Sequence, residues 1–256
     1  TELELIRKHD KDGDKVTVFQ CSGNLPNCHW NIKHNNSQCA TCVSKFENGW
    51  RILNHGKDVL LKEFTLPPQN DLESFDYFAN VNDIESYQHD GENIGYGVVS
   101  TLISRYRDHR FDTRKHYDDI SRTLRTAVHV YDTLKNEIIT SRPNLIYLFN
   151  GRIATHLPAK ILCAKYGIDY YSYEVSQKNN CYTLLKNKTT HDSISVEEVN
   201  QLESCWTPEK EMIGNSILIK MRSGSDLGKN KIFIQDQLKG TLPDNFNYEK
   251  NNIAIF

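Results

Sequence analysis

Four cysteines lie close together near the N-terminus, in the segments Cys21-Ser-Gly-Asn-Leu-Pro-Asn-Cys28 and Cys39-Ala-Thr-Cys42. The second segment is a C-x2-C pair, a spacing that lets two thiolates bind one metal ion. The sequence therefore predicts a structural zinc held by Cys21, Cys28, Cys39 and Cys42, with His29 and His34 as substitute ligands. Two other interpretations stay open: unligated thiols, or disulfides in an oxidising compartment.

A second candidate site follows the continuous apolar run Leu145–Phe149, which is typical of a parallel strand buried on both faces. The next three residues are Asn150, Gly151 and Arg152. Gly151 permits a tight turn, the amide of Asn150 can donate and accept, and Arg152 can bind a phosphate or carboxylate through two parallel hydrogen bonds. The alternative is an ordinary strand-to-helix turn with a surface arginine.

Glu174 ends the next predicted strand, Ile168–Tyr173. Tyrosines precede it, and partial desolvation would raise the pKa of its carboxyl group toward that of a general base. The alternative is a solvated carboxylate, or one paired with Arg152. Asn180 and His191 follow in a polar loop, where amide and imidazole groups suit the hydroxyls of a sugar.

The elements that must position these residues form a strand–helix–strand string. Apolar residues at spacings of three and four predict a long helix from Tyr117 to Ile138 before the first strand. A second helix, Pro158–Tyr166, ends at Gly167 and leads into Ile168–Tyr173. Together with strands at Lys15–Gln20 and Val59–Phe64, this order predicts an α/β fold, a Rossmann-like parallel sheet flanked by helices.

Composition limits the classes of function. The 256 residues carry 31 Lys and Arg against 33 Asp and Glu, a formal net charge of −2, which argues against a nucleic-acid partner. No apolar run approaches the roughly 20 residues that cross a bilayer. Thr1–His9 is polar and unlike a signal peptide, so we expect a cytoplasmic protein.

One stretch of the chain is locally basic. Residues Arg105–Arg125 hold seven Lys or Arg against four Asp. This excess could bind the phosphates of a lipid-linked substrate, or place the protein at the periphery of the inner membrane. The alternative is a solvated helix face. The sequence contains no dinucleotide fingerprint, phosphate-binding P-loop, nucleophile elbow or zinc-protease motif.

The two ends predict a fragment. The chain opens inside a predicted helix, and Ile253–Phe256 reads as the beginning of a strand. We therefore expect one domain over residues 1–250, with a cysteine-rich loop at residues 21–42, and the start of another domain at 251–256.

Several strings resemble bacterial capsule and surface-polysaccharide biosynthesis proteins of glycosyltransferase-B-type architecture. They span most of the chain: Thr1–Ile6, Gly13–Val16, the cysteine segments within 21–42, Asn150–Arg152, Gly167–Glu174, His191-Asp192, and 237–243. The resemblance implies twin Rossmann-like halves, of which this chain is the N-terminal, acceptor-binding one. The missing C-terminal half would hold the nucleotide sugar.

The resemblance also places Asn150, Gly151, Arg152 and Glu174 on the side of the substrate cleft. It implies transfer of a sugar from a nucleotide-sugar donor to a saccharide or lipid-linked saccharide acceptor, with Glu174 as the candidate base. Two alternatives remain: a non-catalytic, metal-stapled assembly module of polysaccharide biosynthesis, or a sugar-nucleotide epimerase of the same architecture.

Overall fold

The computed structural model describes residues 2–31, 33–65, 75, 77–175, 181–190, 192, 196–223, 246, 247 and 249. The chain divides into two compact units, one of Thr1–Val175 with Tyr182–Asp192 and one of Ser176–Cys181 with Ser193–Phe256. The predicted domain boundary at residue 250 and the segment 251–256 lie outside the described residues.

The first unit begins with helix α1 (Glu2–Asp12) and the strands β1 (Val16–Gln20) and β2 (Val59–Glu63). The sequence predicted both strands, and the structure pairs them in parallel, with Val16 opposite Val59. Parallel neighbours require a crossover connection, and helix α2 (Asn36–Leu53) lies in that connection. Asn35 caps α2, because its side-chain oxygen accepts a hydrogen bond from the backbone N–H of Ser37.

The predicted strand–helix–strand unit is confirmed. Strand β5 (Leu145–Phe149) is followed by helix α6 (Leu157–Tyr166) and strand β6 (Asp169–Val175). The strands pair in parallel, with Leu145 opposite Asp169. Gly167 ends α6 in the left-handed region, at a φ of 66°. Strand β7 (Tyr182–Lys186), which the sequence did not predict, pairs antiparallel with β6.

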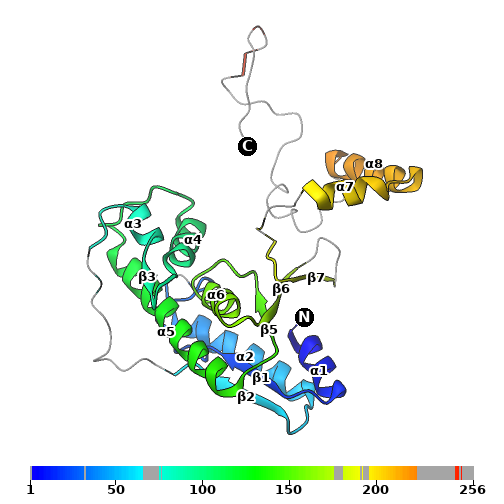
Figure 1. The fold of residues 1–256 in the computed structure, drawn as a ribbon. Helices are drawn as coiled ribbons and strands as arrows, with labels where there is room; N and C mark the ends of the chain where they lie inside the picture. The colour runs from blue at the N-terminus through cyan, green and yellow to red at the C-terminus, as the bar shows by residue number, and fades with distance from the viewer. Residues whose placement is uncertain are drawn as a thin grey trace. The chain divides into compact units, whose positions relative to one another are not determined.

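Helices α4 (Gly95–Tyr106) and α5 (Tyr117–Ser141) supply most of the core. Leu102, Leu124 and Tyr131 are completely buried there, as is Leu162 of α6. Figure 1 shows α5 running beside α4 and α6. A short helix, α3 (Val81–Glu85), and the hairpin of β3 (Gln88–His89) and β4 (Glu92–Asn93) directly precede α4 in the chain.

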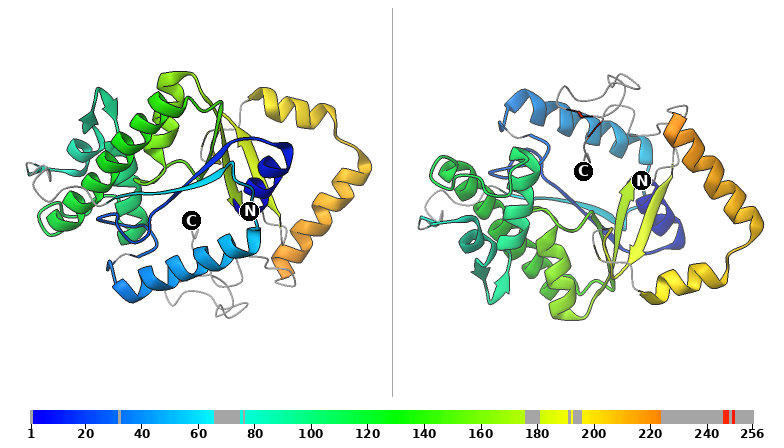
Figure 2. Two further views of the ribbon diagram at one scale, coloured as in Figure 1. Left: turned by 90° about the horizontal axis from the view of Figure 1, so that it is seen from below. Right: turned by 90° about the horizontal axis from the view of Figure 1, so that it is seen from above.

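The first unit is layered. In both views of Figure 2, the strands of β1–β2 and β5–β7 lie between α2 on one side and α5 with α6 on the other. The predicted α/β class is therefore confirmed, as a mixed α/β fold with small sheets. The described strands divide among three small sheets and do not form one extended Rossmann sheet.

The second unit contains helices α7 (Val196–Ser204) and α8 (Pro208–Ser223). Pro208 is the first residue of α8, a position where the missing backbone N–H of proline is tolerated. Among the helices of the described residues, none combines the length and apolar character that crossing a bilayer requires.

Replacing a fully buried leucine of α5 should reveal how much this helix contributes to the core. Leu124 has no exposed surface, whereas Ile139 on the same helix is 52% exposed. Leu124→Ala should lower the free energy of unfolding by about 2–5 kcal/mol, because a cavity adds to the lost burial. Ile139→Ala, the matched control, should change it by about 0.5 kcal/mol or less. Urea unfolding followed by circular dichroism measures both, and equal losses would contradict the assigned core.

Candidate functional site

The turn after β5 brings two of the predicted site residues together. Asn150 and Gly151 both adopt positive φ, at 61° and 84°. The backbone N–H of Asn150 donates to the carbonyl of Tyr173 on β6, at 3.1 Å. Its side-chain Nδ2 donates to Oε2 of Glu174, at 2.8 Å. The amide thus holds a half-buried carboxylate at the carboxyl edge of two parallel strands, the edge where ligands bind in open α/β sheets.

Arg152 turns toward helix α4. Its Nη1 donates to Oγ of Ser100 at 2.7 Å and to Oγ of Ser104 at 3.2 Å. Among the described residues, Asn150 and not Arg152 contacts the carboxylate of Glu174. Arg152 therefore lies over the last turns of α4 rather than in an ion pair with Glu174, the alternative that the sequence offered. The other two predicted binding residues, Asn180 and His191, lie outside the described residues.

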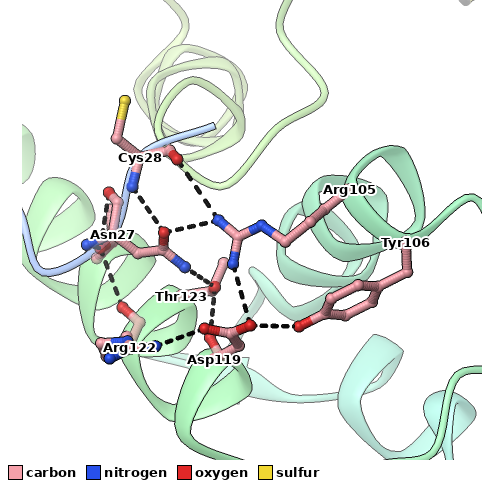
Figure 3. Close-up of polar contacts among 8 residues, drawn as sticks. Asn27, Cys28, Arg105, Tyr106, Asp119, Arg122 and Thr123 are labelled. Atoms are coloured by element: carbon pink, nitrogen blue, oxygen red, sulfur yellow. Dashed lines mark hydrogen bonds and ion pairs between the residues drawn. The ribbon is translucent and has the colours of Figure 1, made fainter. Parts of the chain in front are cut away.

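The loop after β1 is fixed by a buried polar network that the sequence did not predict. Arg105 of α4 donates from Nη2 to Oδ1 of Asn27 at 2.8 Å. Its Nη1 lies 3.5 Å from Oδ2 of Asp119 on α5. Figure 3 shows the guanidinium lying between this loop and α5. The side chain of Arg105 is only 3% exposed, so these partners offset the large cost of burying its charge.

Asn27 links the same loop directly to α5. Its backbone N–H donates to Oγ1 of Thr126 at 2.9 Å, and its Nδ2 donates to Oγ1 of Thr123. Its Oδ1 also accepts from the backbone N–H of Cys28 at 2.8 Å. The side chain of Asn27 therefore hydrogen-bonds to its own loop, to α4 and to α5.

Asp119 is the acidic centre of the network. Burial alone would raise the pKa of its carboxyl group. Hydrogen bonds from Tyr106 and Arg122, with the guanidinium charges nearby, outweigh burial and hold that pKa below its usual range. The pKa of the Tyr106 hydroxyl is raised in turn by burial and by the adjoining carboxylate. Asp119 is therefore ionised at neutral pH and balances Arg105.

His29 stands where the loop after β1 and the turn after β5 meet. Its half-buried ring has a pKa below the usual range, because burial disfavours the charged form. Three guanidinium charges lower that pKa further, those of Arg152, Arg105 and Arg107. The half-buried His156, which precedes α6, is also held neutral, since burial lowers its pKa to about 4.

A narrow hollow lies between these segments. It is lined by Asn27, Cys28 and His29 from the loop, and by Thr101, Thr123, Thr126, Ala154 and Thr155. Its walls are rich in hydroxyl and amide groups, but those of Asn27, Thr101, Thr123 and Thr126 already hydrogen-bond within the protein. The hollow is too narrow to admit a water molecule in this conformation.

The cysteines occupy two kinds of structure. The predicted cysteine-rich loop 21–42 is a loop only as far as Asn35, because α2 begins at Asn36. Cys39 and Cys42 thus lie in the first turns of a helix, whereas Cys21 and Cys28 lie in the loop. Burial raises the pKa of the Cys28 thiol, and the charges of Cys21 and Cys42 add to the rise.

These thiols do not meet as a metal-binding set. Within the part of the chain that the structure describes, no group of three or more His, Cys, Asp or Glu is placed to hold a metal ion. Cys39 Sγ instead accepts a hydrogen bond from Nδ2 of Asn31 at 3.1 Å. As they are placed here, the four cysteines do not form a zinc site. The structure carries no metal that would test the predicted structural zinc.

Comparison with models of protein families, with characterised proteins and with solved structures finds no match to this chain. Three segments supply the candidate site: the loop after β1, the turn after β5 and the end of β6.

The turn after β5 should tolerate no side chain at Gly151. A Cβ there would lie 2.7 Å from Cγ2 of Thr189 and 3.0 Å from Cδ1 of Leu148. Gly13 has a similar φ of +80°, but its Cβ would meet nothing within 4 Å. Gly13→Ala should therefore cost only the backbone strain, about 1–2 kcal/mol. Gly151→Ala should cost a further 1–3 kcal/mol or so from overpacking, measured by urea unfolding. Equal costs would show that the turn can relax.

The network around Asp119 should make stability depend on pH. The native pKa of Asp119 lies below that of the unfolded chain, which is about 3.9. Its carboxylate therefore stabilises the fold fully above that pH, and the stabilisation is lost as the pH falls through the native pKa. Asp119→Asn should cost about 1–3 kcal/mol at pH 7, and the gap to the wild type should narrow below about pH 4.

The neighbouring Asp118 provides the control, because its side chain is exposed on the same helix turn. Asp118→Asn should cost less than about 1 kcal/mol at every pH. A gap for Asp119→Asn that stayed constant from pH 7 to pH 3 would contradict the assigned ionisation. Thermal unfolding across that pH range supplies the measurement.

Proposed function

We propose that this chain is the acceptor-binding domain of a glycosyltransferase in bacterial cell-surface polysaccharide biosynthesis. The observation that carries the proposal is the hydrogen bond from Asn150 to Glu174 at the carboxyl edge of β5 and β6. It holds a carboxylate in a fixed direction at the position where α/β proteins bind ligands. A positioned carboxylate is what removal of a proton from an acceptor hydroxyl requires.

In this reaction Glu174 accepts the proton of an acceptor hydroxyl. The hydroxyl oxygen then forms a bond to the anomeric carbon of the donor sugar, while the bond from that carbon to the nucleoside diphosphate breaks. Asn150 keeps Oε2 of Glu174 in place through its amide, and the backbone N–H of Val175 approaches Oε1 at 3.2 Å. Proton transfer of this kind contributes about 10²–10⁴-fold to the rate of a reaction.

The layered arrangement of the first unit also supports the proposal. Parallel pairs of strands between two helical layers are compatible with the Rossmann-like half that the sequence resemblance implies. In the family that the sequence resembles, a second domain holds the nucleotide sugar. The present domain would then bind the acceptor and supply the base.

Loss of the base should abolish polysaccharide without unfolding the protein. Glu174→Gln keeps the shape of the side chain and still offers an oxygen to Asn150, but cannot accept the proton. We expect transfer to fall by about 10²–10⁴-fold, because the base is lost. The measurement is surface polysaccharide in a bacterial strain that lacks the gene and carries either the wild-type or the variant full-length protein.

The control is Glu47→Gln, the same change at an exposed residue of α2. It should restore polysaccharide to the wild-type level. Full restoration by a stably produced Glu174→Gln protein would show that the carboxylate is not the base, and would favour a non-catalytic assembly module. Thermal unfolding of both purified variants confirms that each is folded.

A further inference from the structure

Helix α1 places a histidine against the sheet formed by β5, β6 and β7. Nε2 of His9 lies 2.9 Å from the hydroxyl oxygen of Tyr147 on β5. Nδ1 of the same ring lies 2.7 Å from Oδ2 of Asp14. A carboxylate can only accept, so in the neutral imidazole Nδ1 carries the proton and Nε2 accepts from the hydroxyl. The three side chains therefore form a series of acid, base and hydroxyl, the arrangement by which proteins activate a nucleophilic oxygen.

The backbone around the end of α1 holds this series in place. The N–H of Asp14 donates to the carbonyl of His9 at 3.0 Å, and Gly13 between them adopts a φ of 80°. The turn thus folds Asp14 back onto the ring of His9. The carboxylate of Asp10 accepts from the N–H of Gly56 at 3.0 and 3.1 Å, which ties the end of the helix to the segment before β2. The imidazole is therefore oriented by the fold itself, as a general base requires.

Tyr147 differs from a neighbouring tyrosine in the group that its hydroxyl contacts. Side chains alternate along a strand, so Tyr147 shares its face of the sheet with Tyr171, on which it stacks at 5.7 Å, and with Tyr173. The hydroxyl of Tyr173 donates to Oε1 of Glu2 at 2.7 Å. The hydroxyl of Tyr147 contacts an imidazole instead, which is a stronger base than a carboxylate. Burial raises the pKa of Tyr147, so its hydroxyl stays protonated at neutral pH and needs a base to react.

The surroundings of Tyr147 favour a small, uncharged reagent. The side chains of Asp14 and His9 are 57% and 22% exposed, and Tyr147 is half-buried, so solvent reaches the group. The charge of Asp14 acts on the Tyr147 hydroxyl, and so does Tyr182, which hydrogen-bonds to Glu4. Both carboxylates are negative, and they repel an anionic electrophile.

We propose that Tyr147 is a nucleophile that His9 and Asp14 activate toward the uncharged acyl group of an ester or thioester. The hydroxyl oxygen of Tyr147 bonds to the carbonyl carbon, while its proton passes to Nε2 of His9. The bond from that carbon to the leaving oxygen or sulfur then breaks, and the leaving group takes the proton from His9. The products are an acyl ester of Tyr147 and a free alcohol or thiol. Asp14 stabilises the imidazolium that forms between the two steps.

This inference goes beyond the proposed function and does not rest on it. Glu174 follows Tyr173 on β6, so alternation places it on the opposite face of the sheet from Tyr147. The two groups therefore do not act on the same bond. An experiment on acylation of Tyr147 leaves the proposal for Glu174 unaffected, and the reverse also holds.

The test is acetylation of the full chain by p-nitrophenyl acetate at neutral pH. Mass spectrometry of proteolytic peptides gives the initial rate at each tyrosine, so acetylation of thiols and amines does not interfere. Tyr96 is 48% exposed and Tyr147 only half-buried, so accessibility alone predicts faster acetylation of Tyr96. Activation by His9 predicts the opposite order, with Tyr147 acetylated faster.

Variants then identify the base. His9→Gln keeps a polar side chain but removes the base, and should slow acetylation of Tyr147 by about 10²-fold or more. Asp14→Asn should slow it by roughly tenfold or more, because an uncharged amide does not stabilise the imidazolium. Neither change should alter the rate at Tyr96. His109→Gln, the same change at an exposed histidine, is the control and should change neither rate.

Acetylation of Tyr96 as fast as that of Tyr147 in the wild type would overturn the proposal, and this comparison needs no variant to fold. An unchanged rate at Tyr147 in a folded His9→Gln protein would also overturn it, and would make the contact of His9 with Tyr147 purely structural. Circular dichroism establishes that the variants are folded.

The assignment to an uncharged substrate has its own test. Acetyl phosphate carries the same acetyl group on an anionic leaving group. The ratio of the rate at Tyr147 to that at Tyr96 should be lower with acetyl phosphate than with p-nitrophenyl acetate, because the carboxylates of Asp14 and Glu4 repel the anion. An equal or higher ratio would contradict the assignment.

Discussion

The guanidinium of Arg105 is the group on which the arrangement of this protein depends. A buried cation is tolerated only with a counter-charge and hydrogen-bond acceptors around it. Here Asp119 supplies the charge and Asn27 the acceptor, and they come from α5 and from the loop after β1. The contacts of this one side chain therefore hold a loop against two helices. The loop then carries His29 to the edge of the strands, beside the turn that holds Asn150 and Arg152.

Most of the regular elements could be predicted from the sequence, because their signals are local. The apolar run Leu145–Phe149, the three- and four-residue spacing of α5 and the glycine that ends α6 each depend on a few neighbouring residues. Helix α2 was missed although a signal was present: Asn35 is a typical N-cap residue, and Val43, Phe46 and Trp50 follow at helical spacing. The C-x2-C spacing within the same residues instead predicts a metal-binding loop.

The candidate site was predictable only where chain order places residues at a strand end. Asn150 and Glu174 fall at the ends of consecutive parallel strands, so topology brings them together. No such rule predicts the partners of Arg105, because a basic residue in a charged helix is usually solvated. Its burial follows from tertiary packing of α4 against α5, which no local pattern reports.

The bonds between Asn27 and α5 join residues far apart in the sequence, since Thr126 lies 99 positions after Asn27. Bringing such distant segments together costs loop-closure entropy before any contact repays it. Contacts of high sequence separation generally slow folding. Helices α5 and α6 can form from local contacts. The loop after β1 reaches its place only when the distant helices α4 and α5 have already formed. The chemistry of the edge is therefore a property of the whole first unit, and no short segment of the chain can reproduce it.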